Sequence, residues 1–324
     1  AMTDCIQAVP AAAVVPDPAD VREVVEGLSR TPRELSPRFF YDERGSRLFE
    51  EITRLPEYYL TRTERALLER WMPDWIGGMA PRALVELGAG SGEKTRIILD
   101  PIASAADRAV YVPVDVSAEF LDETAARIGA AYPSIDVVPV VADITDAFAL
   151  PDRLPGPTLH AFLGSTIGNF APGPAVALLT RVRARMADGD RFLMGVDLRK
   201  DPALIEAGYN DAAGVTAEFN RNMLRVVNAL AGADFDVDAW EHRAFYDRQA
   251  HWIEMHLVAM RAQTVTLAGG AAFHFAAGES IRTEISAKHD RGSVDAMFAA
   301  AGLAVQQWET DADGRYAITL AAPR

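Results

Sequence analysis

The sequence is short of cysteine, of basic residues relative to acidic ones, and of long apolar runs. Its one cysteine, Cys5, excludes a disulfide framework and a thiolate metal site, and it indicates a reducing, cytoplasmic setting. The 46 acidic residues outnumber the 32 lysines and arginines, which leaves a formal net charge of −14. Such a surface repels phosphate groups, so neither nucleic acid nor anionic lipid is an expected partner. Small molecules are favoured, and a cationic one would gain most.

No apolar run approaches the roughly 20 residues that a membrane span requires. Residues 6–15 are apolar but short, and no Lys or Arg precedes them, so we expect no secretory signal. With 324 residues, 49% hydrophobic and 24% charged, the chain has an ordinary globular composition. We expect a folded, cytoplasmic monomer with one large domain or two smaller ones.

From residue 82 onward, short β-rich runs alternate with helical stretches. The expected strands are 83–87, 110–115, 137–142, 160–165 and 191–197, and the expected helices lie near 93–100, 117–131 and 173–187. This alternation is typical of crossover units on a parallel sheet, and it predicts a doubly wound α/β core.

After Asp197 the alternation stops, which predicts a second, α+β domain. We expect a helix near 212–230, antiparallel strands at 242–248, 251–260, 263–268 and 271–276, then a helix near 293–302 and strands at 303–309 and 315–321. The last two strands form a hairpin that could complete the first sheet. The predicted division is 61–199 and 288–324 for the core, and 1–60 and 200–287 for the α+β domain, to which we assign substrate recognition.

Two helix starts are predicted near the amino terminus. Asp17 before Pro18 indicates an N-cap followed by proline at the first helical position. Thr61 with Glu64 three residues later resembles a capping box that opens a helix through Trp71.

A glycine-rich loop follows the first expected strand. Gly88, Gly90 and Gly92 permit a tight turn and close approach of a ligand to the backbone at a helix start. A dinucleotide fingerprint would want glycine where Glu93 stands, so the loop disfavours NAD. Glu86, just before the glycines, adds negative potential that suits a cation.

Two further acids stand where an adenosine would need them. Asp115 ends the second strand, where a carboxylate can accept both ribose hydroxyls, and Asp143 ends the third, where it can accept from the adenine amino group. Together with the glycine loop they resemble the cofactor motifs of class I S-adenosylmethionine-dependent methyltransferases, which have a Rossmann-like sheet. The alternative is a structural glycine turn with two surface acids.

Blocks along nearly the whole chain are similar to the histidine Nα-methyltransferases of ergothioneine biosynthesis. They are residues 40–42, 52–59, 162–169, 209–216, 253–255 and 283–286. The chain departs from the family pattern at Leu60, where proline is usual, and at Ile144, where an aromatic occurs. These departures affect the shape of a loop and the packing of adenine.

The resemblance implies roles for individual positions. Asn169 and Tyr209 would hold the α-carboxylate of the amino acid, and Tyr41 would face its α-amino group. The remaining positions implied for the amino acid are Tyr58 at its side-chain end, Glu284 and Ser286 on the imidazole, and Met255 on the ring. Those implied for the cofactor are Gly88, Lys94, Asp115 and Asp143, with Ile144 beside the adenine.

Each of these residues also has an ordinary structural interpretation. On sequence alone Glu284 is a solvated acid at a strand end, Met255 packs in a core, and Asn169 pairs with backbone in a turn. The tyrosines are core or rim aromatics, although near a quaternary ammonium they would stabilise positive charge. As a partner of an imidazole N–H, Glu284 would disfavour apolar side chains.

The sequence contains neither a nucleophile elbow nor a histidine metal-binding motif. The stretch 164–168 has Thr166 where a nucleophile elbow needs serine, so a hydrolase gains no support. The six histidines lack metal-ligand spacing, and no metal is expected.

The resemblance implies transfer of up to three methyl groups from S-adenosylmethionine to the α-amine of L-histidine, which gives hercynine. Tyr41 would orient the amine, and water or a nearby carboxylate would take the proton. Two alternatives stay open: an N-methyltransferase of another amino acid or a biogenic amine, and a non-catalytic sensor of an adenosyl ligand.

Overall fold

The computed structural model describes residues 15–89 and 92–324. Its contacts divide the chain into two units. The core unit comprises Thr53–Tyr209, Phe245–Glu254 and Ile285–Arg324, and the second unit comprises the described residues up to Ile52 with Asn210–Ala244 and Met255–Glu284. The predicted division had placed residues 53–60, 200–209, 245–254 and 285–287 outside the core. No helix in the described parts of the chain is long and apolar enough to cross a membrane.

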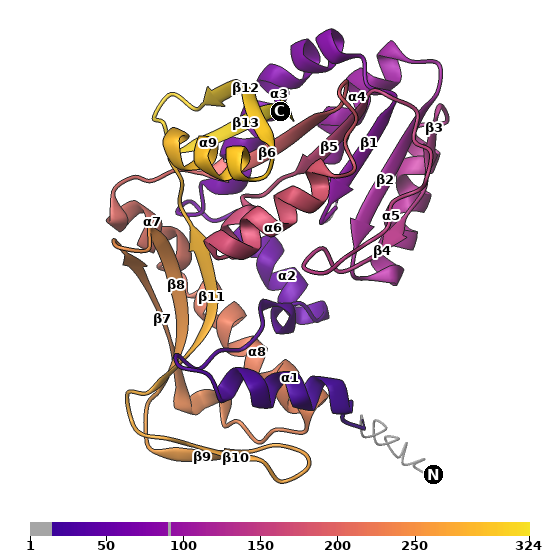
Figure 1. Ribbon diagram of the computed structural model, residues 1–324. Helices are drawn as coiled ribbons and strands as arrows, with labels where there is room; N and C mark the ends of the chain where they lie inside the picture. The colour runs from indigo at the N-terminus through magenta and orange to yellow at the C-terminus, as the bar shows by residue number, and fades with distance from the viewer. Residues whose placement is uncertain (1–14, 90–91) are drawn as a thin grey trace, which may run out of the picture. The chain divides into compact units, whose positions relative to one another are not determined.

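The core unit is built on one mostly parallel sheet (Figure 1). Its strands are β1 (Ala83–Leu87), β2 (Ala109–Asp115), β3 (Ile135–Val137), β4 (Val140–Val141), β5 (Thr158–Phe162), β6 (Arg191–Asp197), β12 (Leu303–Thr310) and β13 (Tyr316–Pro323). They follow the order β12-β13-β6-β5-β1-β2-β3, with β4 also on β2. The pairs among β1 to β6 are parallel, and the hairpin of β12 and β13 adds antiparallel to β6. The predicted doubly wound sheet, completed by the last hairpin, is confirmed.

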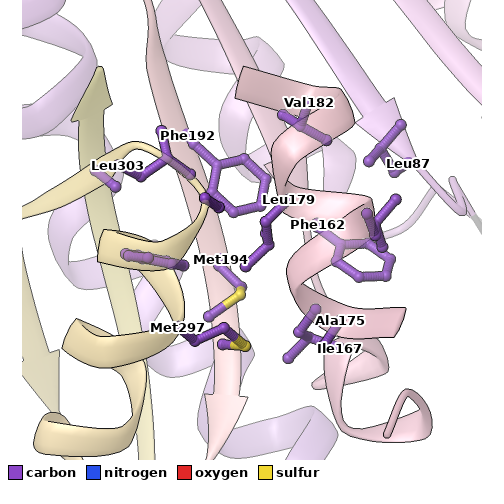
Figure 2. Packing of buried hydrophobic residues seen from close by; sticks show 14 of the residues in the cluster. Leu87, Phe162, Ile167, Ala175, Leu179, Val182, Phe192, Met194, Met297 and Leu303 are labelled. Atoms are coloured by element: carbon purple, nitrogen blue, oxygen red, sulfur yellow. The ribbon is translucent and has the colours of Figure 1, made fainter. Parts of the chain in front are cut away.

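Both faces of this sheet are covered by helices, which explains the nearly continuous apolar runs of its strands. Helices α3 (Leu60–Met79), α4 (Thr95–Ala105) and α5 (Ala118–Ala131) contribute to one buried cluster, and α6 (Pro172–Arg183) and α9 (Arg291–Ala300) to the other. Neighbouring residues of β6 point to opposite faces, so Phe192 joins one cluster and Leu193 the other. Figure 2 shows Phe192 and Met194 packing with Leu179 and Met297.

The expected third strand, 137–142, is broken into β3 and β4. Pro139 has no N–H to donate, so the ladder to β2 is interrupted there. Helix α1 (Pro18–Leu28) starts as predicted, with the Asp17 side chain accepting from the Ala19 N–H at 2.8 Å. The predicted capping box at Thr61 and Glu64 is wrong, because α3 begins at Leu60 with Tyr59 as its N-cap, and it continues past Trp71 to Met79.

The remaining elements are mostly short. They are the helices η1 (Pro37–Phe40), α2 (Glu43–Ile52), η2 (Thr166–Asn169), α7 (Pro202–Tyr209), α8 (Val215–Ala231) and η3 (Val237–Ala239), and the strands β7 (Trp240–Asp247), β8 (Trp252–Ala259), β9 (Gln263–Thr266), β10 (Ala272–Phe275) and β11 (Ser280–Ala287). Strands β9 and β10 form an antiparallel pair, and β7, β8 and β11 a sheet in the order β11-β8-β7. The sequence analysis did not anticipate α2, α7 or β11.

Candidate active site

The glycine loop joins β1 to α4 at the carboxyl edge of the parallel sheet. Gly88 and Gly92 have φ of +63° and +68°, which L side chains rarely adopt, and the Gly88 N–H donates to the Val114 carbonyl at 2.8 Å. Gly90, the middle glycine of the motif, lies outside the described residues. Glu93 is exposed and pairs with Arg65 at 3.0 Å. The glycine loop is therefore a turn in which a ligand can approach the main chain between β1 and α4.

The buried side chain of Glu86 forms hydrogen bonds to two elements beside this turn. Its Oε2 accepts from Thr95 Oγ1 at 2.7 Å and from Tyr111 OH at 2.6 Å, and the residue is only 4% exposed. Burial raises the pKa of Glu86 to about 7, although the two hydrogen bonds and Lys94 act in the opposite direction. Glu86 therefore ties β1 to β2 and to the first turn of α4, and it is only partly ionised at neutral pH.

Asp115 and Asp143 lie side by side at the same sheet edge. Strands β2 and β4 pair Asp115 with Val141, and the Ala142 N–H donates to the Asp115 carbonyl at 2.9 Å. The Asp115 carboxylate accepts from the Ser117 N–H at 3.2 Å. The Asp143 carboxylate accepts from the Thr145 N–H at 2.8 Å through the same oxygen, Oδ1, that binds the Thr145 hydroxyl. These local bonds fix both acids.

Apolar surface surrounds the two acids. Val116 and Val141 are 65% and 59% exposed, and residues around Asp143 line a hollow of about 400 Å³. The residues lining it are Val140, Val141, Ala142, Asp143, Asp146, Ala147, Phe148 and Ala149. Ile144 is half-buried against the core cluster, and its carbonyl accepts from Arg181 at 3.0 Å. Two acids at one sheet edge, exposed valines and the open space beside Gly88 have the chemistry that an adenosyl group needs.

Lys94 is held by Glu64, a fully buried residue of α3. The Glu64 carboxylate also accepts from the Gly164 N–H, at 2.8 and 3.0 Å, and from the Tyr316 hydroxyl. A Cβ on Gly195 would lie 1.8 Å from Glu64 Oε2, so glycine is required there to make room. Glu64 therefore connects Lys94, just before α4, to the turn after β5.

Four of the predicted substrate residues come together within the core unit. Asn169 Nδ2 donates to the Ile285 carbonyl at 2.8 Å, and Tyr209 OH donates to Ser286 Oγ at 3.0 Å. The ring of Tyr58 meets that of Tyr209 edge-on with 6.2 Å between the centroids. The ends of η2, α7 and β11, with the loop before α3, thus place two hydroxyls, an amide and two aromatic rings next to one another.

Tyr41, Met255 and Glu284 belong to the second unit. Tyr41 is 52% exposed, and its ring meets those of Phe49 and Phe219, each at 5.9 Å. Met255 is buried in β8, where its carbonyl accepts from Thr283 Oγ1 at 3.1 Å. Glu284 is half-buried within β11 rather than at a strand end.

The sequence analysis missed a buried ionic cluster in the core unit. Asp197, at the end of β6, accepts from Lys200 at 2.7 Å, from Lys288 at 2.8 Å and from the Tyr59 hydroxyl at 2.8 Å. Burial and the Asp197 charge raise the pKa of Tyr59, and burial lowers the pKa of Lys200 to about 8. A signal was available in the sequence, because the chain has only three lysines, Lys94, Lys200 and Lys288. In the structure all three pair with fully buried carboxylates.

Within the described residues, no group of three or more His, Cys, Asp or Glu could hold a metal ion. His251 lies in the turn before β8 with φ of +56°, and His256 lies in that strand.

Comparison of the chain with known proteins identifies its family. A family model described as histidine-specific methyltransferase, SAM-dependent, matches residues 20–323. A histidine N-alpha-methyltransferase of Mycolicibacterium smegmatis is 44% identical over 93% of this chain and 94% of its own length. One of Mycobacterium tuberculosis is 42% identical over 93% and 94%. An Aspergillus fumigatus N-methyltransferase is 30% identical over 91% of this chain and 81% of its own length.

The match spans both units, and the sheet order, the glycine turn and the two acids at the carboxyl edge agree with it. The chain belongs to the family of histidine-specific, S-adenosylmethionine-dependent methyltransferases.

Proposed function

We propose that this protein transfers methyl groups from S-adenosylmethionine to the α-amine of L-histidine, up to three times, to give hercynine. The observation that carries the proposal is the 44% identity to a histidine N-alpha-methyltransferase over nearly the full length of both chains. Because that similarity is not confined to the sheet, it supports a shared acceptor as well as a shared cofactor.

The described residues fit S-adenosylmethionine. We propose that the Gly88 turn receives its amino-acid portion beside Lys94, that Asp115 accepts the ribose hydroxyls, and that Asp143 accepts from the adenine amino group. Ile144 and the hollow around Asp143 would cover the adenine. When bound, the cofactor supplies a methyl group on a positively charged sulfonium.

For the amino acid, we propose that Asn169 and Tyr209 hold the α-carboxylate and that Tyr58 lines the side-chain end. The contacts of these three residues around the end of β11 support a common role. Glu284 and Ser286 occupy alternate positions of β11, so strand geometry gives their side chains a common direction. We propose that both bind the imidazole.

Met255 would pack on the imidazole ring, and Tyr41, whose side chain is exposed, would face the amine. The protein's main task is alignment, because a displacement at an activated carbon needs the nitrogen held in line. An α-ammonium has no lone pair, so one proton must leave before each transfer. Tyr41 orients the amine, and water or a neighbouring carboxylate accepts the proton.

A reaction of the purified protein with S-adenosylmethionine and an equimolar panel of L-histidine, L-tryptophan, L-tyrosine and histamine tests this function. Mass spectrometry should show mono-, di- and trimethylated histidine, with the other acceptors modified far more slowly. Faster methylation of another acceptor would reassign the substrate. Cofactor binding without transfer to any acceptor would indicate a sensor and contradict the proposal.

We also propose that the chain acts as a cytoplasmic monomer on small molecules alone. Its net charge of −14 supports the absence of a nucleic-acid partner, because phosphates would be repelled. Light scattering on the eluted protein should give the mass of one chain, and a doubled mass would contradict it.

A further inference from the structure

The ionic cluster around Asp197 contains more positive than negative charge. Lys288 and Lys200 both pair with this one carboxylate, and their side chains are 0% and 7% exposed. Two arginines adjoining the cluster already have carboxylate partners: Arg199 pairs with Asp290 at 2.6 Å. Arg315 likewise pairs with Asp311 at 3.0 Å. With both ammonium groups protonated, the cluster carries a formal charge of +1.

Such a surplus is costly in a buried place, because the desolvation of each ion is offset only by a partner. The surplus therefore needs an explanation. The third donor to Asp197 is the neutral Tyr59 hydroxyl, which adds no negative charge. A ligand with one negative charge would balance the cluster.

Lys288 directs its hydrogen bonds at the residues that we propose bind the substrate. An ammonium group has three N–H donors. Those of Lys288 reach Asp197 Oδ2 at 2.8 Å, Tyr209 OH at 2.8 Å and Ser286 Oγ at 3.0 Å. Lys200, by contrast, bonds to Tyr59 OH at 2.7 Å and to the Leu198 carbonyl. Of the two lysines, Lys288 is therefore the one connected to Tyr209 and Ser286.

These contacts limit the directions in which two hydroxyl groups can donate. The Tyr209 oxygen accepts from Lys288, so its proton points elsewhere, and Ser286 Oγ lies 3.0 Å away. Ser286 Oγ accepts from both Lys288 and Tyr209, which fills its two lone pairs and leaves its own proton to be donated. Ser286 therefore presents a donor, and Tyr209 can redirect its proton to an incoming acceptor.

We propose that Lys288 is a positioning residue that makes the enzyme selective for substrates bearing a carboxylate. It holds the hydroxyl groups of Tyr209, which we place on the α-carboxylate, and of Ser286, which we place on the imidazole, as hydrogen-bond donors, and its own positive charge lies directly behind them. The proposal rests on the proposed function and deepens it, because it assigns the recognition of the α-carboxylate to a charge that does not touch the substrate. A purely structural lysine would stabilise the fold without altering which ligands bind.

The test compares L-histidine with L-histidinamide, which keeps the side chain and amine but lacks the negative charge. Calorimetry on protein saturated with S-adenosylhomocysteine gives both dissociation constants without turnover. The wild type should bind histidine at least about tenfold more tightly, the effect of one charge-assisted hydrogen bond. In K288M this ratio should fall to within about threefold, with affinity for S-adenosylhomocysteine unchanged.

K200M is the matched control, since it removes the other ammonium group from Asp197 and leaves Tyr209 and Ser286 bonded to Lys288. K200M removes as much charge from the cluster as K288M does but keeps the hydrogen bonds of Lys288, so its ratio should fall less than that of K288M. In K288M the charge of Asp197 stays balanced by Lys200. The double variant K288M/D197N returns the cluster to a formal charge of +1 but still lacks the hydrogen bonds of Lys288 to Tyr209 and Ser286, and it should also show a smaller preference than the wild type.

A wild-type protein that binds histidine but prefers it to the amide by less than about threefold would overturn the inference, whether or not the variants fold. So would an unchanged ratio in K288M or in the double variant, or an equal loss in K200M. In each of these cases histidine methylation by the wild type would still stand. Failure of the wild type to bind or methylate histidine would instead refute the proposed function.

Discussion

The Glu86→Gln substitution should change how the stability of the core unit depends on pH. Glu86 is buried beneath the glycine loop, and its pKa rises from 4.5 to about 7 on folding. The native state therefore holds a proton that the unfolded chain releases between these two values. Stability from this proton is fully present below pH 4.5 and is lost as pH rises through 7.

The size of the effect follows from the two pKa values. Each unit of difference corresponds to about 1.4 kcal/mol, so a rise from 4.5 to about 7 corresponds to about 3 kcal/mol. Glutamine keeps the shape, and its carbonyl oxygen can accept from both Thr95 and Tyr111 as the carboxylate does. Its amide does not titrate, so any cost of the substitution itself is independent of pH.

Urea unfolding of wild type and variant, paired at each pH from 4.5 to 8, measures this difference. The wild-type stability minus that of Glu86→Gln should fall by about 3 kcal/mol as pH rises, because all other titrations cancel in the pair. Glu69→Gln, at an exposed position of α3, is the control and should give a flat difference. A flat difference for Glu86→Gln as well, or one that rises with pH, would refute the assigned burial of this carboxyl.

Three further substitutions test the site and the packing that holds it. Asp115→Ala should weaken S-adenosylmethionine binding at least about tenfold by removing a charged acceptor, whereas Asp136→Ala, on exposed β3, should not; calorimetry showing equal affinities would remove the ribose role. Glu284→Ala should lower kcat/KM for histidine at least about tenfold relative to tryptophan, and an unaltered ratio of the two would exclude it from specificity. Gly195→Ala should destabilise the fold by about 1–3 kcal/mol, because the new Cβ would lie 1.8 Å from a buried carboxylate oxygen. Gly173→Ala, which meets nothing within 4 Å, should be nearly neutral in the same urea titration, and similar losses for both would contradict the packing argument.

The parallel sheet was predictable because its strands are buried on both faces. Such strands form short, nearly continuous apolar runs, and β1 is buried at all five positions. The crossover helices follow from the alternation of these runs with amphipathic stretches. The addition of the last hairpin to this sheet could be proposed because two more β-rich runs follow the helix expected near 293–302.

Strand β11 escaped prediction although its residues alternate. Ile281 and Thr283 are fully buried between half-buried neighbours, but the polar residues among them resemble a loop in composition. Helix α7 has eight residues, which is too short for periodicity to be distinctive. Hydrophobic periodicity therefore does not predict elements that are short and contain both polar and apolar residues.

The position of the two acids at the carboxyl edge of the sheet was easier to predict than the buried contacts beside them. Asp115 and Asp143 could be placed because parallel strands bring their carboxyl ends to one edge. Glu64 was assigned to a capping box because it follows Thr61 by three residues, as the acid of such a box does. In the structure its carboxylate instead binds residues 94, 164 and 316, which are distant in the sequence. Pairing across such distances in sequence depends on tertiary structure, so no local pattern reveals it.

The position of the transferred methyl groups tests the central claim most directly. L-Histidine incubated with S-adenosylmethionine labelled with carbon-13 at its methyl group should yield a product whose label, followed by heteronuclear NMR, ends in a single trimethylammonium signal on the α-nitrogen. Label on a ring nitrogen, on a different amino acid in preference to histidine, or retained entirely on the donor would contradict the account.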